Sequence, residues 1–595
     1  MADPVVIDFE TRPAIAGSGQ APVPVGVSVL IPGQPNVYFG WGHPGGNPDT
    51  YEQGRAMLVS VWQRPLLFHH CKFDIGVAIE HMGLPWPEHV DDTLFQVFLV
   101  DPLAKSLGLK QTAHKLLGMD PEERDAVYRW LKENFKGPFL PDHKVITESN
   151  AGAYISYAPY DIVAPYAMGD TARTLSLHRL LRPKVTAMGM DAAYQRELKV
   201  ARIGYWMERK GVLVDRERLE QDYGKYDAIK HECEDRIRIY LGDIDLDKPV
   251  QIATALLETG HADTLPLTPT GRMSTAKSSI ESSVDEPALA RLLRYRGALK
   301  TLTQTFFKGW LKFSERDSHL HPSWNQVKSF GVGARTGRFS CSEPNLTNVP
   351  TEFDEETLEG LDLPFMRQYL LPDPGHVIVP ADYNGQEMRI MAHYAEGKAL
   401  EIYQKDPQAD FHAVASLLIK LHAGLSVSRK MCKIVGFSLI YGSGIALLAK
   451  NLGVDEDTAR KIKTAYFKAI PGLQEFISLF RERSSVRTWG GRVMPVEPAH
   501  EVDGEWREFN YKLCNYLIQG SAADQTKEAL VRYDGEYGRL LMTVHDELVI
   551  SVPEECLPQE VPRLKNAMEG MPGWDCRFVA EVEYGPDWHN LRAYK

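Results

Sequence analysis

One short stretch limits what this chain can fold into more than any other: residues 540 to 552 read LLMTVHDELVISV. Its flanks are apolar, as in a buried pair of strands, yet its middle holds His545, Asp546 and Glu547. Buried carboxylates without a partner are strongly destabilising. The fold must therefore compensate the charge of Asp546 and Glu547, and the rest of the sequence indicates how.

The chain is too long for a single hydrophobic core. At roughly 150 residues per domain, 595 residues predict about three or four units. A hydrophobic content of 44% with 25% charged residues is typical of folded globular proteins and not of disordered ones. No apolar run reaches the roughly 18 residues of a membrane span, and the opening MADPVVIDFE lacks the basic residues of a targeting peptide. We expect a cytoplasmic protein.

Cysteine usage and net charge exclude further classes. The seven cysteines are scattered without a C-x-x-C pair, which indicates reduced core thiols and neither a zinc site nor a disulfide framework. The net charge of −12 excludes a protein that is basic all over. A local positive channel for nucleic acid stays compatible with it, because affinity for phosphate depends on the local field.

The mixture of predicted strands and helices changes along the chain, which predicts a multidomain α/β protein. Residues 1–188 mix short strands such as PVVIDFE and PLLFHH with amphipathic helices. Residues 189–321 are mostly helical, and residues 322–595 alternate strands such as HVIVPADY with long helices such as SRKMCKIVGFSLIY.

The first segment holds four acids in a suggestive arrangement. Asp8 and Glu10 end an apolar strand, where the two-residue period places both carboxylates on one face, although such a pair alone is commonly a solvated strand end. Asp74 follows in HHCKFD, and Tyr166 and Asp170 share a helix face in YAMGD. Four acids and a tyrosine suit a two-metal site that makes hydroxide and holds a leaving oxygen.

The order and spacing of these residues resemble the tyrosine subtype of the DEDD 3′ to 5′ exonucleases. The resemblance implies an RNase H-like fold for residues 1–188 and proofreading activity. Its implied metal ligands and water-orienting tyrosine are Asp8, Glu10, Asp74, Asp170 and Tyr166. The chain departs from the pattern at His70, where relatives often carry Asn, and this departure concerns contacts to the primer end.

A second constellation lies in residues 326–550. HVIVPADYNGQE places Asp382 at the end of a buried strand, where an acid is commonly a helix cap. In SRKMCKIVGFSLIYG, residues spaced by four share one broad helix face: Arg429, Lys433, Phe437 and Tyr441. Cations at one end and aromatic rings at the other can hold a nucleoside triphosphate. The alternative is a helix with a mixed surface.

Three motifs in fixed order, D-Y-x-x-x-E, R-x-x-x-K-x-x-x-F-x-x-x-Y-G and V-H-D-E, resemble motifs A, B and C of the family A DNA polymerases. This is the group of bacterial DNA polymerase I and many phage replicases. ARTGRFSCSEPNLTNVP, DFHA and CNYLIQGSAAD extend the resemblance. It implies a right hand beside the exonuclease domain, with a thumb (189–321), a palm in two parts (322–400 and 501–595) and fingers (401–500).

The resemblance also answers the opening question. It implies that Asp382 and Asp546 bind two Mg²⁺ ions, with Mn²⁺ as a substitute, and that these ions activate the primer 3′ hydroxyl and hold the triphosphate. Glu547 is then a supporting group and His545 a contact to the primer terminus.

The remaining implied roles concern nucleotide and DNA. His412, Arg429 and Lys433 would bind the triphosphate, and Lys433 would also donate a proton to pyrophosphate. Glu387 would exclude a ribose 2′ hydroxyl, and Tyr441 would stack at the templating position. The implied nucleotide set is Arg429, Lys433, Phe437, Tyr441, His412, Glu387 and Tyr383. The implied minor-groove contacts, for which ordinary capping is the alternative, are Arg338, Asn345, Asn348, Asn515 and Gln519.

Several positions depart from the family pattern. Phe437 stands where many phage members have Tyr, which implies poor use of dideoxynucleotides. The other departures, which concern primer–template contacts, are Gly385, Gly436, Ser438 and Tyr511. In the thumb segment, a cluster of cations offers phosphate contacts or a solvated charged face: Arg291, Arg294, Arg296 and Lys300.

We therefore expect a DNA-directed DNA polymerase with a proofreading exonuclease. Because the exonuclease pattern begins at the N-terminus without a 5′-nuclease segment, the sequence favours a phage or plasmid replicase, or a trimmed repair enzyme, over a full-length bacterial DNA polymerase I. Of these, we expect a phage-type replicase in a bacterial cell or a phage-infected host. It would act as a monomer on primer–template DNA and dNTPs, beside a helicase, a primase and a single-strand binding protein.

Two alternatives belong to other classes. A DNA-binding scaffold with decayed centres has no physical reason to keep its buried acids. A nuclease with only a duplex grip has no role for the helix of Lys433 and Phe437.

Overall fold

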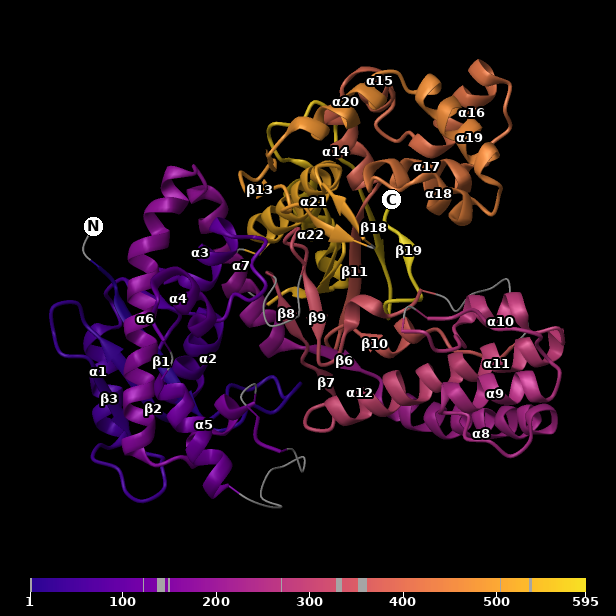
Figure 1. Ribbon diagram of the computed structural model, residues 1–595. Helices are drawn as coiled ribbons and strands as arrows, with labels where there is room; N and C mark the ends of the chain where they lie inside the picture. The colour runs from indigo at the N-terminus through magenta and orange to yellow at the C-terminus, as the bar shows by residue number, and fades with distance from the viewer. Residues whose placement is uncertain are drawn as a thin grey trace.

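A computed structural model describes residues 3–120, 122–135, 145–147, 150–268, 270–327, 334–351, 361–502, 504–534 and 538–595. Its elements form an N-terminal sheet with covering helices, a helical arm, and a central sheet that carries a second group of helices (Figure 1). Within these described ranges, no helix combines the length and the apolar character needed to cross a membrane.

The N-terminal unit is built on a mixed five-stranded sheet in the order β3-β2-β1-β4-β5. β1 runs antiparallel to β2 and parallel to β4. The strands are β1 (Val5–Thr11), β2 (Pro24–Leu30), β3 (Val37–Gly40), β4 (Leu66–Phe68) and β5 (Val90–Asp92). The helices are α1 (Tyr51–Val61), α2 (Cys71–Met82), α3 (Thr93–Val100), α4 (Leu109–Leu117), α5 (Glu122–Asn134) and α6 (Tyr160–Ala187).

The long helix α7 (Asp191–Lys210) joins this unit to the centre of the molecule. The predicted boundary at residue 189 places α7 with the helical arm, but it packs on α2 and α3 and on the central helix α21 (Lys512–Tyr533). The physical reason is that α7 is buried on more than one side. Its Tyr194 belongs to the N-terminal core and its Met207 to the central core.

The helical arm consists mainly of α8 and α11, which pack against each other. On α11, the buried Arg296 forms ion pairs with Glu234, at 2.9 Å, and with Asp247, which also pairs with Lys300. Arg296 and Lys300 thus have acidic partners within the arm, while the phosphate contacts expected of this cluster stay a prediction. The arm contains α8 (Arg216–Leu241), α9 (Pro249–Glu258), α10 (Lys277–Ser283), α11 (Pro287–Lys300) and α12 (Lys308–Phe313).

The central sheet has the order β16-β17-β11-β18-β19, so β11 pairs on both sides. The expected strand pair at 540–552 is confirmed as β16 and β17, joined by a turn at His545 and Asp546. The strands are β11 (His376–Tyr383), β16 (Leu540–Val544), β17 (Glu547–Pro553), β18 (Ala580–Tyr584) and β19 (Arg592–Ala593). Two further helices are α14 (Gln386–Ala395) and α22 (Leu557–Glu569).

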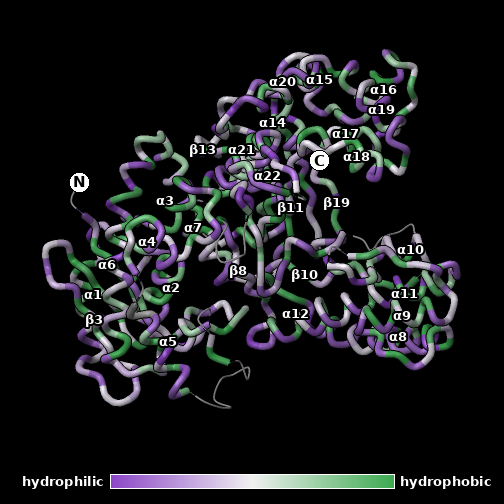
Figure 2. The backbone as a smooth tube through the Cα atoms, in the orientation of Figure 1, coloured by the Kyte–Doolittle hydropathy of each residue, from purple (hydrophilic) through white to green (hydrophobic). Residues whose placement is uncertain are grey.

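A second group of helices projects from the central sheet to the same side as the helical arm (Figure 1). It contains α15 (Gly397–Lys405), α16 (Phe411–Ala423), α17 (Arg429–Ile440), α18 (Ile445–Leu452), α19 (Glu456–Ala469) and α20 (Leu473–Ser478). The hairpin of β12 (Ser485–Arg487) and β13 (Val493–Pro495) follows and packs on α21. Figure 2 shows hydrophobic residues along the central strands around β11, where the main core lies.

Four small strand pairings complete the fold. β6 (Val212–Val214) lies between β7 (His319–Leu320) and β10 (Leu370–Leu371) at the base of the arm. β8 (Ser323–Asn325) pairs with β9 (Ser340–Ser342), and β14 (His500–Val502) pairs with β15 (Glu505–Arg507).

Candidate active sites

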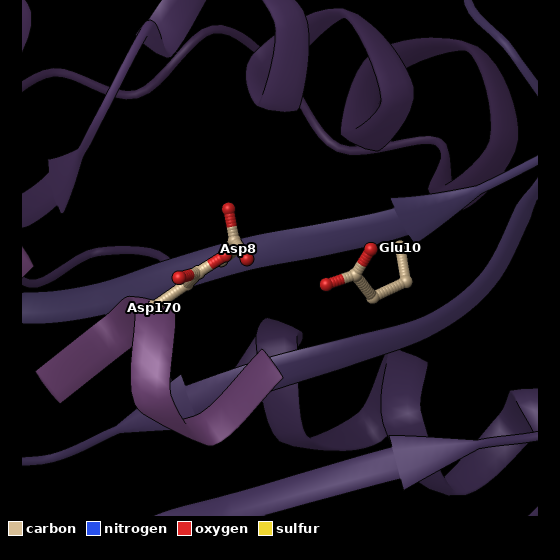
Figure 3. A group of neighbouring side chains, drawn as sticks. All are labelled: Asp8, Glu10 and Asp170. Atoms are coloured by element: carbon tan, nitrogen blue, oxygen red, sulfur yellow. The ribbon is translucent and has the colours of Figure 1, made fainter. Parts of the chain in front are cut away.

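Three carboxylates meet in the N-terminal unit. Asp8 and Glu10 come from β1, and Asp170 reaches them from α6 (Figure 3). One ligand atom from each lies within 4.8 Å of the others. The sheet holds Asp8 and Glu10 on one face, as the two-residue period predicts.

The electrostatics of this cluster favour a bound cation. Burial, followed by the charge of Asp170, raises the pKa of Asp8 to about 8. Burial and the neighbouring acids also raise the pKa of Glu10 well above its usual value. The charges of the neighbouring acids thus oppose the ionisation of Asp8 and Glu10, and a divalent cation relieves that repulsion. A set of carboxylate oxygens fits Mg²⁺ or Mn²⁺.

Asp74 and Tyr166 border the cluster. Asp74, on the first turn of α2, is 2% exposed, and its Oδ1 accepts a hydrogen bond of 2.9 Å from the Phe9 N–H. Asp74 thus lies beside the three clustered carboxylates, and burial with the charge of Asp8 raises its pKa. Tyr166 lies one turn before Asp170 on α6, as expected. His70, the departure from the family pattern, caps α2 with a left-handed φ of 83°.

Lys110 is a functional candidate that the sequence did not reveal. Its Nζ, on α4, lies 2.5 Å from Asp170 Oδ2 and 3.9 Å from the centre of the Tyr166 ring. Burial opposes its charge, but Asp170 and Tyr166 outweigh burial and raise the pKa of Lys110. In GLKQTAHKLLG this residue reads as an ordinary helix lysine, and only the packing of α4 on α6 brings it to the cluster.

The second site is a cavity of about 540 Å³ between β11, the β16–β17 turn and α17. The four residues predicted to share one face of α17 all line it. Asp382 and Asp546 line it as well. The lining residues predicted from sequence are Arg338, Asp382, Tyr383, Glu387, His412, Arg429, Lys433, Phe437, Tyr441, His545 and Asp546.

The acids of this cavity repeat the pattern of the first cluster. Asp382 on β11 faces Glu547 on β17 in the antiparallel register, and Asp546 occupies the adjoining turn. Burial, then Asp546 and Glu547, raises the pKa of Asp382 to about 8. Burial also raises the pKa of Asp546. These oxygen donors fit the same hard cations.

Glu547 follows Asp546 in the chain and pairs with Asp382 across the sheet, but it does not line the cavity. Its Oε1 accepts a hydrogen bond of 3.0 Å from Trp588 Nε1. The guanidinium of Arg367 lies 3.8 Å from the centre of the Trp588 ring and counteracts the rise in the pKa of Glu547 that burial causes. Arg367 is a second charge partner that no motif predicted.

Polar contacts join three elements around the cavity. Glu387 on α14 forms an ion pair with Arg338 and accepts a hydrogen bond of 3.2 Å from the Tyr441 hydroxyl. Gln519 Nε2 on α21 donates to the same hydroxyl at 3.1 Å. Glu387 and Tyr441 are therefore connected with two of the five predicted minor-groove residues, Arg338 and Gln519.

The other end of the cavity is suited to an anion. Arg429 forms an ion pair with Asp410, while Lys433 has no carboxylate partner among the described residues. Burial, helped by Lys433 and Arg429 and opposed by Asp410, lowers the pKa of His412 to about 4. His412 Nδ1 is buried without a hydrogen-bond partner, as expected of a group that a ligand would satisfy.

A family model described as DNA polymerase family A matches residues 216–590, more than half of the sequence. The chain belongs to DNA polymerase family A. The matched residues begin at α8 and include the whole cavity, whereas the N-terminal acidic cluster precedes them.

This family A chain is similar to curated bacterial enzymes. It is 26% identical over 624 residues to DNA polymerase I of Pseudomonas aeruginosa, covering 98% of this chain and 63% of that protein. It is 28% identical over 600 residues to DNA polymerase I of Chloroflexus aurantiacus, covering 95% and 59%. The chain thus spans less than two thirds of the length of these relatives.

A solved structure shares the fold of this family A chain. The POL domain of Pol1 from M. smegmatis, in complex with DNA primer-template and dNTP, matches with a TM-score of 0.77 at 21% identity. The match covers 98% of this chain and 95% of that one.

Some predicted side chains of this family A chain have other partners. Tyr383 borders the cavity, but its hydroxyl donates to the Met568 carbonyl at 2.7 Å and its ring is 2% exposed, so the side chain belongs to the core. Asn345 Oδ1 accepts from the Thr347 N–H at 3.0 Å, which is the capping role left open above. Asn515 Oδ1 is buried and accepts no hydrogen bond from the described residues, and its expected contact to DNA stays a prediction.

The structure explains three departures from the family pattern. Gly385 has a left-handed φ of 63° at the start of α14, a conformation that suits glycine. A Cβ on Gly436 would lie 2.9 Å from the Tyr466 hydroxyl, so a larger residue there would displace that ring. Tyr511 packs on Gly442, where a Cβ would meet its ring at 2.5 Å.

Proposed function

We propose that this chain synthesises DNA from dNTPs on a template by two-metal nucleotidyl transfer, and that its N-terminal unit removes mispaired 3′ ends as a 3′ to 5′ exonuclease. The observation that carries the proposal is the cavity in which Asp382 and Asp546 face Lys433 and His412. Acids for metal ions and groups for a triphosphate stand there at opposite ends. The shared fold with a polymerase domain bound to primer–template and dNTP supports the same proposal.

Asp382 and Asp546 would hold Mg²⁺ in the cavity, and Asp8, Glu10, Asp74 and Asp170 would hold it in the N-terminal unit. When bound, Mg²⁺ activates an attacking oxygen and stabilises charge on the leaving oxygen.

The chain's own residues orient the incoming nucleotide. Lys433 and Arg429 bind the triphosphate oxygens, for which Arg429 exchanges its ion pair with Asp410 for one with phosphate. His412 Nδ1 supplies a further contact, and Lys433 lies where it can donate a proton to pyrophosphate. Glu387 blocks a ribose 2′ hydroxyl, and its bond to Tyr441 fixes the ring next to the templating base.

In the N-terminal unit, Tyr166 orients the water that attacks the terminal phosphodiester. Lys110 pairs with Asp170, so this carboxylate would have to exchange that partner to hold a metal ion. The mixed sheet with its acids on the central strand β1 supports the RNase H-like assignment.

The assignment of subdomains follows the same proposal. We assign 1–188 to the exonuclease, with α7 as its link to the palm, and α8 to α12 to the thumb. Residues 322–400 and 501–595 form the palm around β11 and β17, and 401–500 form the fingers around α17. Primer–template DNA and dNTPs are the proposed ligands. The phage-type origin, the replication proteins as partners, the monomeric state and the cytoplasmic location stay predictions.

A labelled primer on a longer template with Mg²⁺ tests both activities. The wild type should extend the primer when dNTPs are present and shorten it when they are absent. Asp546→Asn and Asp382→Asn should lose extension and keep shortening, while Asp8→Asn should do the reverse. The matched control is Asp587→Asn, a buried acid outside both sites.

Each alternative has its own outcome in this assay. If the primer is shortened both with and without dNTPs, the chain is a nuclease with a duplex grip. If the primer is neither extended nor shortened, the chain is a DNA-binding scaffold. Wild-type extension by either palm variant would contradict the metal assignment.

A further inference from the structure

A second groove lies among α18, α19 and α20, outside the catalytic cavity. It encloses about 830 Å³ and is open to solvent. The residues that matter for its chemistry are Ile445, Arg460, Lys463, Phe467, Lys468 and Glu475. We call it the α18–α19 groove.

The groove carries positive charge that the protein does not neutralise. Within the described parts of the chain, neither Lys463 nor Lys468 forms an ion pair, while Arg460 pairs with Glu456 at 3.0 Å. Arg481 adds to the field at Lys463, because burial and the charge of Arg481 both lower the pKa of Lys463. In a chain with a net charge of −12, such a local cluster attracts anions.

The position of the groove connects it to the catalytic cavity. Tyr441 lines the cavity at the end of α17, and Ile445 lines the groove at the start of α18, so a turn of only three residues, 442–444, separates them. The turn is fixed by Gly442, whose backbone packs directly against the Tyr511 ring. A strand that leaves the templating position over this turn reaches the groove next.

The composition of the groove suits single-stranded nucleic acid more than a simple anion. Cations track phosphates, and aromatic rings stack on bases of any sequence. Phe467, half-buried between Lys463 and Lys468 on α19, supplies such a ring. Glu475 is the one carboxylate in the lining, and it keeps the positive field from extending across the whole groove.

We propose that the α18–α19 groove binds single-stranded template DNA ahead of the templating base, with Lys463 and Lys468 on phosphates and Phe467 against a base. This inference rests on the proposed polymerase function and deepens it. It assigns to α19 the task of holding the uncopied strand.

Fluorescence anisotropy of primer–template duplexes with a single-nucleotide or an about ten-nucleotide 5′ template overhang tests the proposal. The variant is Lys463→Glu with Lys468→Glu. The matched control is Lys461→Glu, which reverses one charge on the same helix outside the groove lining. Thermal unfolding of all three proteins checks that each is folded.

The wild type and the control should bind the long overhang more tightly than the short one. The double variant should lose that gain while its affinity for the short overhang stays unchanged. With two fewer phosphate contacts, its slope of log K against log salt on the long overhang should fall by about 1.4, at about 0.7 per single-strand phosphate. Phe467→Ala should weaken long-overhang binding by about tenfold, because base stacking is worth about 1–3 kcal/mol.

Three results would overturn the proposal or the function beneath it. If the double variant still binds the long overhang more tightly than the short one by the wild-type factor, the groove is excluded as a template site. Equal losses on short and long overhangs point to a general charge effect and also exclude it. A wild type that binds primer–template with an overhang gain but never extends the primer contradicts the polymerase function and leaves the groove assignment standing.

Discussion

At the scale of single residues, both sites bring carboxylates close to one another: Glu10 and Asp170 are buried, Asp8, Asp546 and Glu547 are half-buried, and Asp382 is open to the cavity. Asp8 and Asp382 sit on strands with further acids beside them, and their pKa values rise to about 8. Protein cations also lie beside these acids: Lys110 and Arg173 pair with Asp170, and Arg367 lies near Glu547. These cations offset part of the negative charge at each site.

This arrangement predicts a dependence of metal-free stability on pH. In the unfolded chain, Asp8 and Asp382 ionise near pH 4, whereas in the folded chain they keep their protons up to about pH 8. Because the folded state then binds more protons, stability in EDTA should fall as pH rises from about 4 to about 8.

Thermal unfolding with and without Mg²⁺ at pH 6 and pH 8.5 measures this dependence. Mg²⁺ should raise Tm, and more so at the higher pH, where the carboxylates need the cation most. Asp8→Asn should remove part of the effect. A Tm in EDTA that rises across this pH range would contradict the raised pKa values.

A second residue-scale prediction concerns Phe437. Its ring lies 6.0 Å from both Tyr441 and His412, inside the cavity. Phe437→Tyr adds a hydroxyl there, which can make the hydrogen bond that a nucleotide without a 3′ hydroxyl leaves unmade. One bond of about 1.4 kcal/mol corresponds to about tenfold, so the variant should use dideoxynucleotides at least about tenfold better relative to dNTPs. Phe437→Leu controls for disturbed packing, and equal ratios for wild type and Phe437→Tyr would refute the expectation.

At the scale of elements, the hairpin β16–β17 and the helix α17 form the two walls of the cavity. The hairpin turns at His545, whose φ of 59° is left-handed. This turn lets two apolar strands present Asp546 at their tip while the strands stay buried. α17 presents Lys433 and Phe437 on the face opposite its buried residues, such as Cys432 and Val435.

The left-handed φ of His545 should make this turn sensitive to a β-branched residue. Asn tolerates a left-handed φ, whereas the β-branched Val does not, with a difference of about 1–2 kcal/mol. Both His545→Asn and His545→Val lose the imidazole, so a loss of primer extension that both variants share measures the proposed contact of the imidazole to the primer. The additional loss of stability in His545→Val, measured by urea unfolding, measures the cost of a β-branched residue at this left-handed φ. Equal stabilities of the two variants would show that the turn relaxes.

Much of both elements could be predicted from sequence, because their patterns are local. Apolar runs with acids at their ends predict β1, β11 and the β16–β17 hairpin. The four-residue spacing from Arg429 to Tyr441 predicts which face of α17 lines the cavity. Lys110 and Arg367 could not be predicted, since each reaches its site through packing between elements distant in sequence. The contacts of α7 with both units could not be predicted for the same reason, because they join elements distant in sequence. The boundary at residue 189 stays a prediction.

At the scale of the whole molecule, α7 couples the N-terminal unit to the central helix α21 through buried ion pairs. Lys527 on α21 donates to both carboxylate oxygens of Glu197 on α7, at 2.7 and 2.8 Å, and to the Gln326 carbonyl. Beside it, Asp524 accepts from Arg492 at 2.6 Å. The helix α21, which carries Asn515 and Gln519, is therefore anchored at its other end to α7 and through it to the N-terminal unit.

The anchor leads to the last prediction. Lys527→Met leaves Glu197 buried and uncompensated, which should cost about 3–5 kcal/mol in denaturant unfolding. Combining it with Glu197→Leu replaces the pair by apolar groups and should recover most of that loss, because a buried ion pair and a packed apolar pair are often nearly equal in stability. If the double variant shows the sum of the two single losses instead, the two residues are not coupled. If it recovers stability but shortens mispaired primers more slowly than the wild type, the charged pair serves the transfer of the primer end between the two sites and not the fold alone.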